Sequence, residues 1–227
     1  MLSCVLQQLS EIDGIEWIRV MYAFPTGFPT DVLEQIDRND KVCRYLDMPV
    51  QHVADPVLAS MRRGITGARL NDLIGEIRNN VPGIALRSTL IVGYPNEGEE
   101  EFRRLFDFVR EVKFERLGVF TYSREDGTHA YPLGDPVPQE VKEERCKAIM
   151  EAQREISLAA NARRVGTRMK MIVDHREGSA AIGRSEFDAP EVDNEITVQS
   201  ASSMVAGNFY DVEIVDSAEY DLFAIPK

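Results

Sequence analysis

The chain has 227 residues, of which 44% are hydrophobic and 28% are charged, a composition typical of folded proteins and unlike that of intrinsically disordered ones. Its 38 acidic residues outnumber its 26 basic ones and give a net charge of -12, which disfavours nucleic acid as the default partner because phosphates are repelled. No window approaches about 18 uncharged apolar residues, and the start has no basic segment followed by an apolar one, so membrane spanning and secretion are not expected.

The first part of the chain alternates between strand and helix patterns. Each of four expected strands is followed by a helical pattern. These strands are expected at residues 17–22, 42–47, 84–92 and 117–122. Helix starts are signalled at Thr30-Asp31, at Asp55-Pro56 and by the acidic first turn of residues 97–112. Because each helix returns the chain to the same end of the sheet, the strands should pair in parallel.

Four such units are only half of an eight-unit barrel. Residues 1–12 predict a helix with no strand before it, as expected of a chain that enters in the middle of a unit. The fold class expected here is therefore α/β, either a wound sheet or a partial (β/α) TIM-like barrel whose amino-terminal half is missing.

A long amphipathic helix is predicted next, at residues 139–164, after the stop signal at residues 135–138. Its expected apolar face is formed by Val141, Ile149, Ala152 and Ile156. Gly166 can adopt the left-handed conformation that ends a helix. We place the domain boundary there, with a (β/α) domain at residues 1–160 and a second domain at residues 161–227.

Five short strands are expected in the second domain. They lie at residues 168–173, 180–186, 195–199, 209–215 and 220–225. Alternating apolar residues in two of them are typical of half-buried antiparallel strands. Five such strands in about 60 residues predict a small, antiparallel, OB-like β-barrel.

The three cysteines, Cys4, Cys43 and Cys146, are far apart in the sequence. Their spacing is that of neither a disulfide framework nor a short metal-ligand pair. The residues therefore predict no metal site, and the chain fits a reducing cytoplasm.

Polar residues follow three of the predicted strands, where sites on parallel sheets usually lie. Gln51 and His52 follow the second strand, the Gly93-Tyr94-Pro95 turn follows the third, and Tyr122 and Ser123 follow the fourth. A structural alternative exists for the histidine, as a hydrogen-bonded core residue, and for the glycine turn, as a simple strand end. The acidic run at residues 97–101 is expected to be a solvated helix start.

The third strand also carries Arg87, Ser88 and Thr89 within an apolar run. A buried guanidinium needs an acceptor, which could be a structural carboxylate or a group of a ligand. The residues alone therefore predict a β/α domain with a polar mouth, and do not identify its reaction.

Three long segments resemble the radical SAM methylthiotransferases, in the order found in that family. They are Tyr45-Leu46-Asp47-Met48-Pro49-Val50-Gln51-His52, Leu86-Arg87-Ser88-Thr89-Leu90-Ile91-Val92-Gly93-Tyr94-Pro95, and Gly118-Val119-Phe120-Thr121-Tyr122-Ser123. The last 60 or so residues resemble the family's TRAM domain. Residues 188–193 and 220–222 are most similar to the RimO-type branch, which modifies ribosomal protein S12.

This resemblance implies insertion of a methylthio group at the β-carbon of an S12 aspartate by radical chemistry. It implies S-adenosyl-L-methionine (SAM) and [4Fe-4S] clusters as cofactors. It also implies SAM binding by Arg87, Ser88, Thr89, the Gly93-Tyr94-Pro95 turn, Tyr122 and Ser123. Gln51 and His52 would face the substrate. The family's CxxxCxxC motif is absent, so we expect the missing amino-terminal part of the enzyme to carry the cluster ligands and this chain alone to be inactive. No catalytic residue is assigned.

Charge favours a protein substrate over tRNA. Residues 161–227 contain seven basic and twelve acidic residues, whereas an RNA-binding barrel is expected to be basic and an acidic one suits a basic ribosomal protein. Two alternatives stay open at this point: a fragment of a tRNA methylthiotransferase, and a non-catalytic module that binds S12 or RNA.

Overall fold

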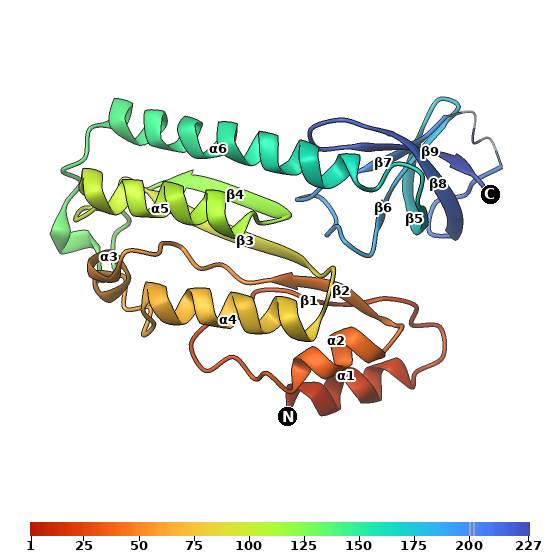
Figure 1. The fold of residues 1–227 in the computed structure, drawn as a ribbon, viewed down its shortest axis with the longest axis horizontal. Coiled ribbons are helices and arrows are strands. Elements are labelled where there is room, and N and C mark those ends of the chain that lie inside the picture. Colours follow the sequence, from red (N-terminus) through yellow and green to blue (C-terminus); the bar gives the residue numbers. More distant parts are fainter. Residues whose placement is uncertain (200, 202) are drawn as a thin grey trace.

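The computed structural model describes residues 1–199, 201 and 203–227. It consists of a four-stranded sheet with helices and of a closed five-stranded barrel at one end of the molecule (Figure 1). The long helix α6 (Gln139–Ala162) runs from the far side of the sheet to the barrel (Figure 1).

The sheet is parallel throughout, in the order β1-β2-β3-β4. Its strands are β1 (Ile18–Val20), β2 (Val42–Asp47), β3 (Ala85–Val92) and β4 (Arg116–Thr121). The expectation of a partial α/β barrel is confirmed. Strand ends differ by a residue or two from those expected, because local patterns do not define where pairing stops.

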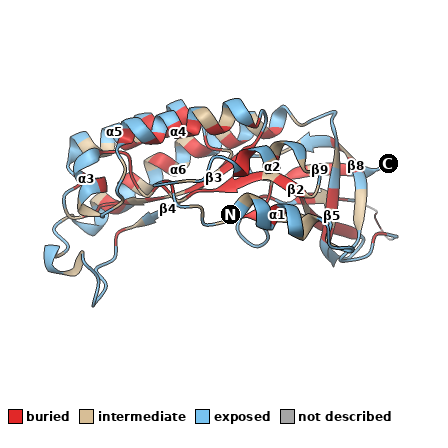
Figure 2. Cartoon of the chain, turned by 90° about the horizontal axis from the view of Figure 1, so that it is seen from below, coloured by how far each residue is buried: buried red, intermediate tan, exposed pale blue. Residues whose placement is uncertain are grey.

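One face of the sheet is covered by helices. These are α1 (Leu2–Ser10), α2 (Val32–Arg38), α3 (Asp55–Ser60), α4 (Gly67–Asn80), α5 (Glu99–Val112) and α6, and a single 3₁₀ turn, η1 (Tyr131–Leu133), precedes α6. Side chains from α2, α4, α5 and α6 pack into one apolar core with the strands. Figure 2 shows this core as the red inner faces of α4, α5 and α6.

Helix α6 buries a different face from the one the sequence predicts. Only Ile149 of the expected apolar set is fully buried, and polar residues occupy most of the buried positions, mainly at steps of four. The buried residues of the helix are Lys142, Arg145, Ile149, Gln153, Ser157 and Asn161. Lys142 and Arg145 donate to backbone carbonyls after β4 and β3, and Gln153 and Asn161 donate to the Phe114 and Ala218 carbonyls. The helix therefore binds through hydrogen bonds as well as apolar contacts.

The barrel closes in the order β5-β6-β7-β9-β8. Its strands are β5 (Arg168–Glu177), β6 (Ala180–Ser185), β7 (Ile196–Val198), β8 (Phe209–Ser217) and β9 (Leu222–Pro226). The expected barrel is confirmed, and its pairs are antiparallel except that β7 and β9 run parallel. Gly183 packs so close to the backbone of β5 that a Cβ would lie 2.0 Å from the carbonyl oxygen of Ile172.

The β6–β7 loop, residues 186–195, connects the barrel to the second face of the sheet. Its Phe187 and Ala189 pack with Cys43, Tyr45 and Ala85 beside the first half of the strands. Among the described residues, no helix has the length and apolarity needed to cross a membrane.

Candidate functional site

The carboxyl ends of β2, β3 and β4 form one mouth on the uncovered face of the sheet. Side chains alternate along β3, so that Ser88 faces the helices whereas Arg87 and Thr89 face the uncovered side. Arg87 lies in the first half of β3, in register with Arg116 at the start of β4. β2 contributes Asp47 to the same side. The isolated bridge between Gln51 and Leu90 extends the pairing beyond the end of β2. Residues from three separate motifs of the sequence therefore meet at this edge.

Arg87 is held between two carboxylates. Its Nη1 donates to Asp47 Oδ1 at 3.0 Å, and its Nε donates to Oδ1 of Asp193, a residue of the β6–β7 loop, at 3.3 Å. Both acids are buried, and 13% of the Arg87 side chain is exposed. Burial lowers the pKa of Arg87, but the hydrogen bond to Asp47 and the charges of Asp47 and Asp193 together outweigh burial and raise that pKa overall. Of the two acceptors that the sequence left open for the Arg87 guanidinium, a structural carboxylate or a ligand, the structure shows structural carboxylates.

The barrel shapes this network through Asp193. The Tyr45 hydroxyl donates to Asp193 Oδ2 at 2.6 Å, and the amide of Ala189 donates to the same oxygen at 2.8 Å. Burial raises the pKa of Asp193 although these donors lower it, and burial together with the neighbouring carboxylate raises the pKa of the Tyr45 phenol. The sequence does not predict this contact, because nothing local marks a pairing across 106 residues.

Two residues at the mouth have an unusual backbone. Tyr22 has φ 57° and Gln51 has φ 70°, the left-handed region that bulky side chains rarely adopt. The amide of Tyr22 donates to Asp47 Oδ2 at 3.1 Å, and Gln51 Oε1 is buried without a hydrogen-bond partner among the described residues. Strain and an unpaired polar atom at the ends of adjacent strands are typical of functional sites.

The Gly93 turn is held from behind by Glu97. The Gly93 amide donates to Glu97 Oε1 at 2.9 Å, and Arg145 Nη1 donates to the same oxygen at 2.7 Å. Gly93 has φ 74°, and a Cβ there would lie 2.3 Å from Lys142 Cγ. Only glycine therefore fits at this position. The prediction of a solvated acidic helix start is wrong for Glu97, which is 4% exposed and lies before α5, whose N-cap is Gly98.

His52 is buried and belongs to the same support. Its Nδ1 accepts from the Ala54 amide at 3.0 Å, so its Nε2 carries the proton and donates to Glu97 Oε2 at 3.0 Å. Both ring nitrogens are occupied inside the protein. Gln51 lies at the mouth and His52 behind it, and their assignment to the substrate stays a prediction.

The other predicted SAM contacts lie around the mouth in different environments. Ser88 is buried, where its hydroxyl donates to the Met48 carbonyl at 3.0 Å and accepts from the Val50 amide. Tyr94 and Tyr122 are buried and pack edge to face at 5.2 Å. The exposed Ser123 hydroxyl donates to Glu125 at 2.7 Å. The structure thus brings these residues to one end of the sheet but turns Ser88 away from its open face.

Lys142 and Arg145 of α6 are supports that sequence reasoning missed. Lys142 Nζ donates to the Tyr122 carbonyl at 3.0 Å and to Asp135 at 2.7 Å, and its side chain is 2% exposed. Charged residues three apart on one helix share a face, and this spacing is the signal in the sequence that could have identified them.

The residues present do not fit an iron–sulfur cluster. Cys4 is exposed on α1, Cys43 is buried in β2 and Cys146 is partly buried on α6. Burial raises the pKa of Cys43 to about 11, which disfavours the thiolate form that ligates iron. Within the described part of the chain, no group of three His, Cys, Asp or Glu residues is placed to hold a metal ion.

Comparison with known proteins gives consistent matches for both parts of the chain. Residues 165–226 match the TRAM domain model. A protein of Christiangramia forsetii named ribosomal protein uS12 methylthiotransferase RimO is 50% identical over 223 residues, covering 98% of this chain and 50% of that protein. Proteins of the same name from Flavobacterium johnsoniae and Parabacteroides distasonis are 48% and 43% identical. The chain spans about half the length of the curated relatives it matches.

Among solved structures, the chain is similar to Escherichia coli coproporphyrinogen III oxidase (HemN), described as a radical SAM enzyme. The TM-score is 0.50 at 21% identity, and the match covers 70% of this chain and 37% of that one. A likeness at this identity supports the fold of the sheet and its helices alone.

Proposed function

We propose that this chain, a homologue of the uS12 methylthiotransferases over about half their length, is part of a radical SAM enzyme that methylthiolates ribosomal protein S12. The observation that carries this proposal is the 50% identity over 98% of the chain. That match includes all three segments that line the mouth. A tRNA methylthiotransferase and a non-catalytic module are less favoured, because the matched relatives carry the S12 name.

The mouth around Arg87 is our proposed SAM site. Two buried carboxylates share one guanidinium there, so the network carries an excess of negative charge that favours the sulfonium and ammonium groups of SAM. Thr89 contributes a hydroxyl to the same face, the Gly93-Tyr94-Pro95 turn brings backbone close, and Tyr122 and Ser123 border the opening. When bound, SAM supplies the radical and the methyl group of the family's reaction. Ser88 contributes indirectly by fixing Val50.

Cluster ligands are proposed to lie outside this chain, since its cysteines do not fit a cluster. The chain alone should therefore be inactive, and the missing amino-terminal part of the enzyme is the partner it requires. No step through the cluster can be assigned to residues described here.

The barrel is proposed to recognise the protein substrate. We divide the chain into a (β/α) unit at residues 1–160 and a TRAM unit at residues 161–227, and the acidic excess of the latter would attract a basic ribosomal protein in the cytoplasm. Gln51, with its unpaired Oε1, is the proposed substrate contact at the mouth, whereas His52 supports it from within.

Binding measurements test this proposal without requiring turnover. The 227-residue chain would be titrated with purified S12, with a tRNA anticodon stem and with SAM. We expect S12 to bind with an affinity that falls as salt rises, SAM to bind with measurable heat, and the RNA to bind more weakly than S12. Tighter binding of the RNA would contradict the substrate, and S12 binding without any SAM binding would favour a non-catalytic module.

A matched pair of variants locates the SAM site. Thr89→Val removes a hydroxyl from the mouth while keeping the side-chain shape, and we expect about fivefold weaker SAM binding, the worth of one hydrogen bond of about 1 kcal/mol. Thr167→Val removes the hydroxyl of an exposed threonine bonded to the Arg164 carbonyl and should leave SAM binding unchanged. Equal effects of the two substitutions would place the site elsewhere.

A further inference from the structure

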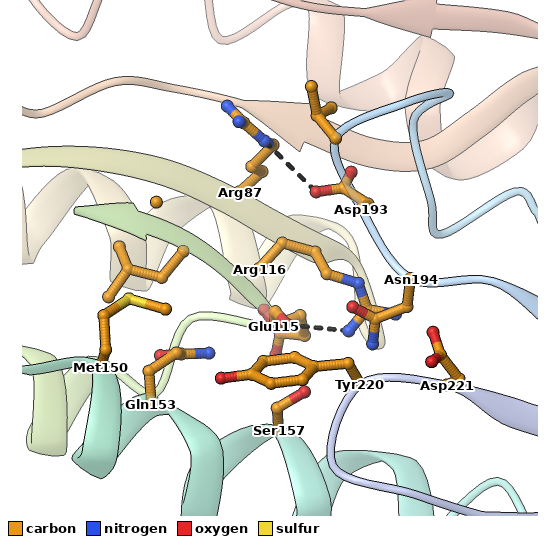
Figure 3. A pocket seen from close by; sticks show the side chains of 13 residues that line it. Arg87, Glu115, Arg116, Met150, Gln153, Ser157, Asp193, Asn194, Tyr220 and Asp221 are labelled. Atoms are coloured by element: carbon orange, nitrogen blue, oxygen red, sulfur yellow. Dashed lines mark hydrogen bonds and ion pairs between the residues drawn. The ribbon is translucent and has the colours of Figure 1, made fainter. Parts of the chain in front are cut away.

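A cavity lies beside the first residues of β4 and shares Arg87 and Asp193 with the mouth. Its volume is about 280 Å³, and its walls come from β4, from the second half of α6 and from two loops of the barrel (Figure 3). It therefore lies at the junction between the two units. Its size is at the small end of ligand pockets, which run from roughly 300 Å³ upwards.

Three buried polar atoms in this cavity have no hydrogen-bond partner among the residues that the structure describes. They are Gln153 Oε1, Ser157 Oγ and Asn194 Nδ2, on side chains that are 2%, 2% and 8% exposed as residues. Figure 3 shows Gln153 and Ser157 rising from α6 and Asn194 on the opposite wall. Because unpaired buried polar atoms are costly and uncommon, three of them around one cavity point to an occupant.

Their chemistry is partly fixed by the surrounding structure. Gln153 Nε2 donates to the Phe114 carbonyl at 2.8 Å, so Oε1 of the same amide is an acceptor directed elsewhere. Asn194 Nδ2 is a donor, and the Ser157 hydroxyl can act as either. A complementary ligand must therefore offer at least one donor and one acceptor.

Charge selects a neutral ligand. Arg87 and Arg116 line the cavity but are paired with carboxylates, and Glu115 is paired with Arg78. A cation would be disfavoured by the two arginines and could not accept a hydrogen bond from the Asn194 amide. An anion would be disfavoured by the nearby carboxylate of Asp221 and could not donate a hydrogen bond to Gln153 Oε1. Neither sign of charge is matched here, because each would leave at least one buried polar atom without a partner.

The remaining walls suit the apolar part of a small molecule. Leu117, Met150 and Val192 line the cavity, and Tyr220, whose ring lies between Ser157 and Arg116 in Figure 3, is 39% exposed. A partly exposed aromatic residue beside a buried polar end provides both contact area and a route of entry.

We infer that this cavity binds a small neutral ligand carrying a carboxamide, whose N–H donates to Gln153 Oε1 and whose carbonyl accepts from Asn194 Nδ2. Ser157 completes the set with its hydroxyl. The three residues of this proposed site do not belong to the mouth, although the cavity shares Arg87 and Asp193 with it, and the inference does not depend on the proposed reaction.

Three probes of similar shape and different charge test the inference: propionamide, propionate and propylammonium. Each would be titrated into the 227-residue chain, with binding followed through the side-chain NH₂ resonances of Gln153 and Asn194 in ¹H–¹⁵N spectra. We expect saturable shifts of both resonances with propionamide alone. Shifts with all three probes, or with none, would overturn the inference, the latter meaning that the cavity holds water only.

Substitutions at Ser157 provide a second measurement. Ser157→Ala should weaken propionamide binding about fivefold, as expected for one hydrogen bond, and Ser157→Leu should abolish it by filling the cavity. Ser10→Ala, which removes a hydroxyl bonded to the Gln7 carbonyl on α1, serves as the control and should change nothing. Propionamide binding retained in Ser157→Leu would refute the site, and if that variant does not fold, the charge series on the unmodified chain still decides.

Discussion

The two ends of the parallel sheet are built differently. At the amino ends of the strands, the β6–β7 loop covers the open face and is held by two arginines. Arg116 Nε donates to the buried carboxylate of Asp188 at 2.8 Å, and the part-buried Arg19 donates to the Glu186 carbonyl at 2.6 Å. At the carboxyl ends, the residues Tyr22 and Phe120 are 78% and 60% exposed. One end is closed by the barrel and the other is open.

The closed end of the sheet therefore serves mainly the stability of the fold, and the open end is available for binding. Buried pairs and packed rings at the closed end hold the two units together, whereas backbone strain and exposed aromatic rings at the open end are kept where a ligand or partner can use them. Substitutions at the closed end should therefore change the free energy of unfolding, and those at the open end should leave it nearly unchanged.

The largest expected effect is at the closed end. Asp188→Ala leaves the Arg116 side chain, 9% exposed, without its carboxylate. An uncompensated buried charge costs about 3–5 kcal/mol, which urea denaturation would measure as a lower free energy of unfolding. Glu100→Ala removes the partner of Arg104 in an exposed pair and should cost less than about 1 kcal/mol. Similar losses in the two variants would contradict the closed-end interpretation.

Gly93 lies at the open end but is supported from the core. A substitution there tests whether some positions at the open end also contribute to the free energy of unfolding. Gly93→Ala adds a Cβ that clashes with Lys142 and forces an unfavourable φ, and we expect a loss of about 2–4 kcal/mol in unfolding free energy. Gly83→Ala has a similar φ of 80° with nothing within 4 Å, so it should cost only about 1 kcal/mol. The difference between the two measures the clash; equal values would mean that Lys142 moves aside.

Much of the fold could be predicted because it depends on local patterns. The strand at residues 42–47 was predicted at its observed bounds, and the five barrel strands were found from alternation and turns. The buried face of α6 could not be predicted in this way. Its buried Gln153 and Asn161 are stabilised by carbonyls at Phe114 and Ala218, and such tertiary partners leave no periodic apolar signal.

The site could be predicted only in part, for the same reason. Arg87 was identified because a charge within an apolar strand requires a partner. One of its two partners, Asp193, lies in another unit of the chain. Glu97 is buried although an acidic run before a helix usually faces solvent. Pairings between distant segments depend on the fold and not on spacing.

A smaller effect on the free energy of unfolding, one that depends on pH, should arise from Asp193 in the β6–β7 loop. Burial raises the pKa of this carboxyl above its ordinary value of 3.8, so the folded state binds the proton more tightly than the unfolded state does. This contribution to stability is present below about pH 3.8 and is lost as pH rises through the raised pKa. Asp193→Asn should remove that decline in urea denaturation between pH 4 and 7. Glu191→Gln, in the same loop, is the control, and a decline that persists in Asp193→Asn would show that another group causes it.

The smallest expected effect is at the open end, and one substitution made at both ends isolates it. Phe120 lies on β4 with 60% of its surface exposed, whereas Phe187, in the β6–β7 loop, packs with Cys43 and Tyr45. Phe120→Ser should change the free energy of unfolding by less than about 0.5 kcal/mol, as exposed positions do, and Phe187→Ser should lower it by at least about 1.5 kcal/mol because apolar area is lost from the core. Since the chemical change is identical, only the location differs. A loss at Phe120 as large as that at Phe187 would mean that the open end is packed in solution, and the distinction between the two ends of the sheet would fail.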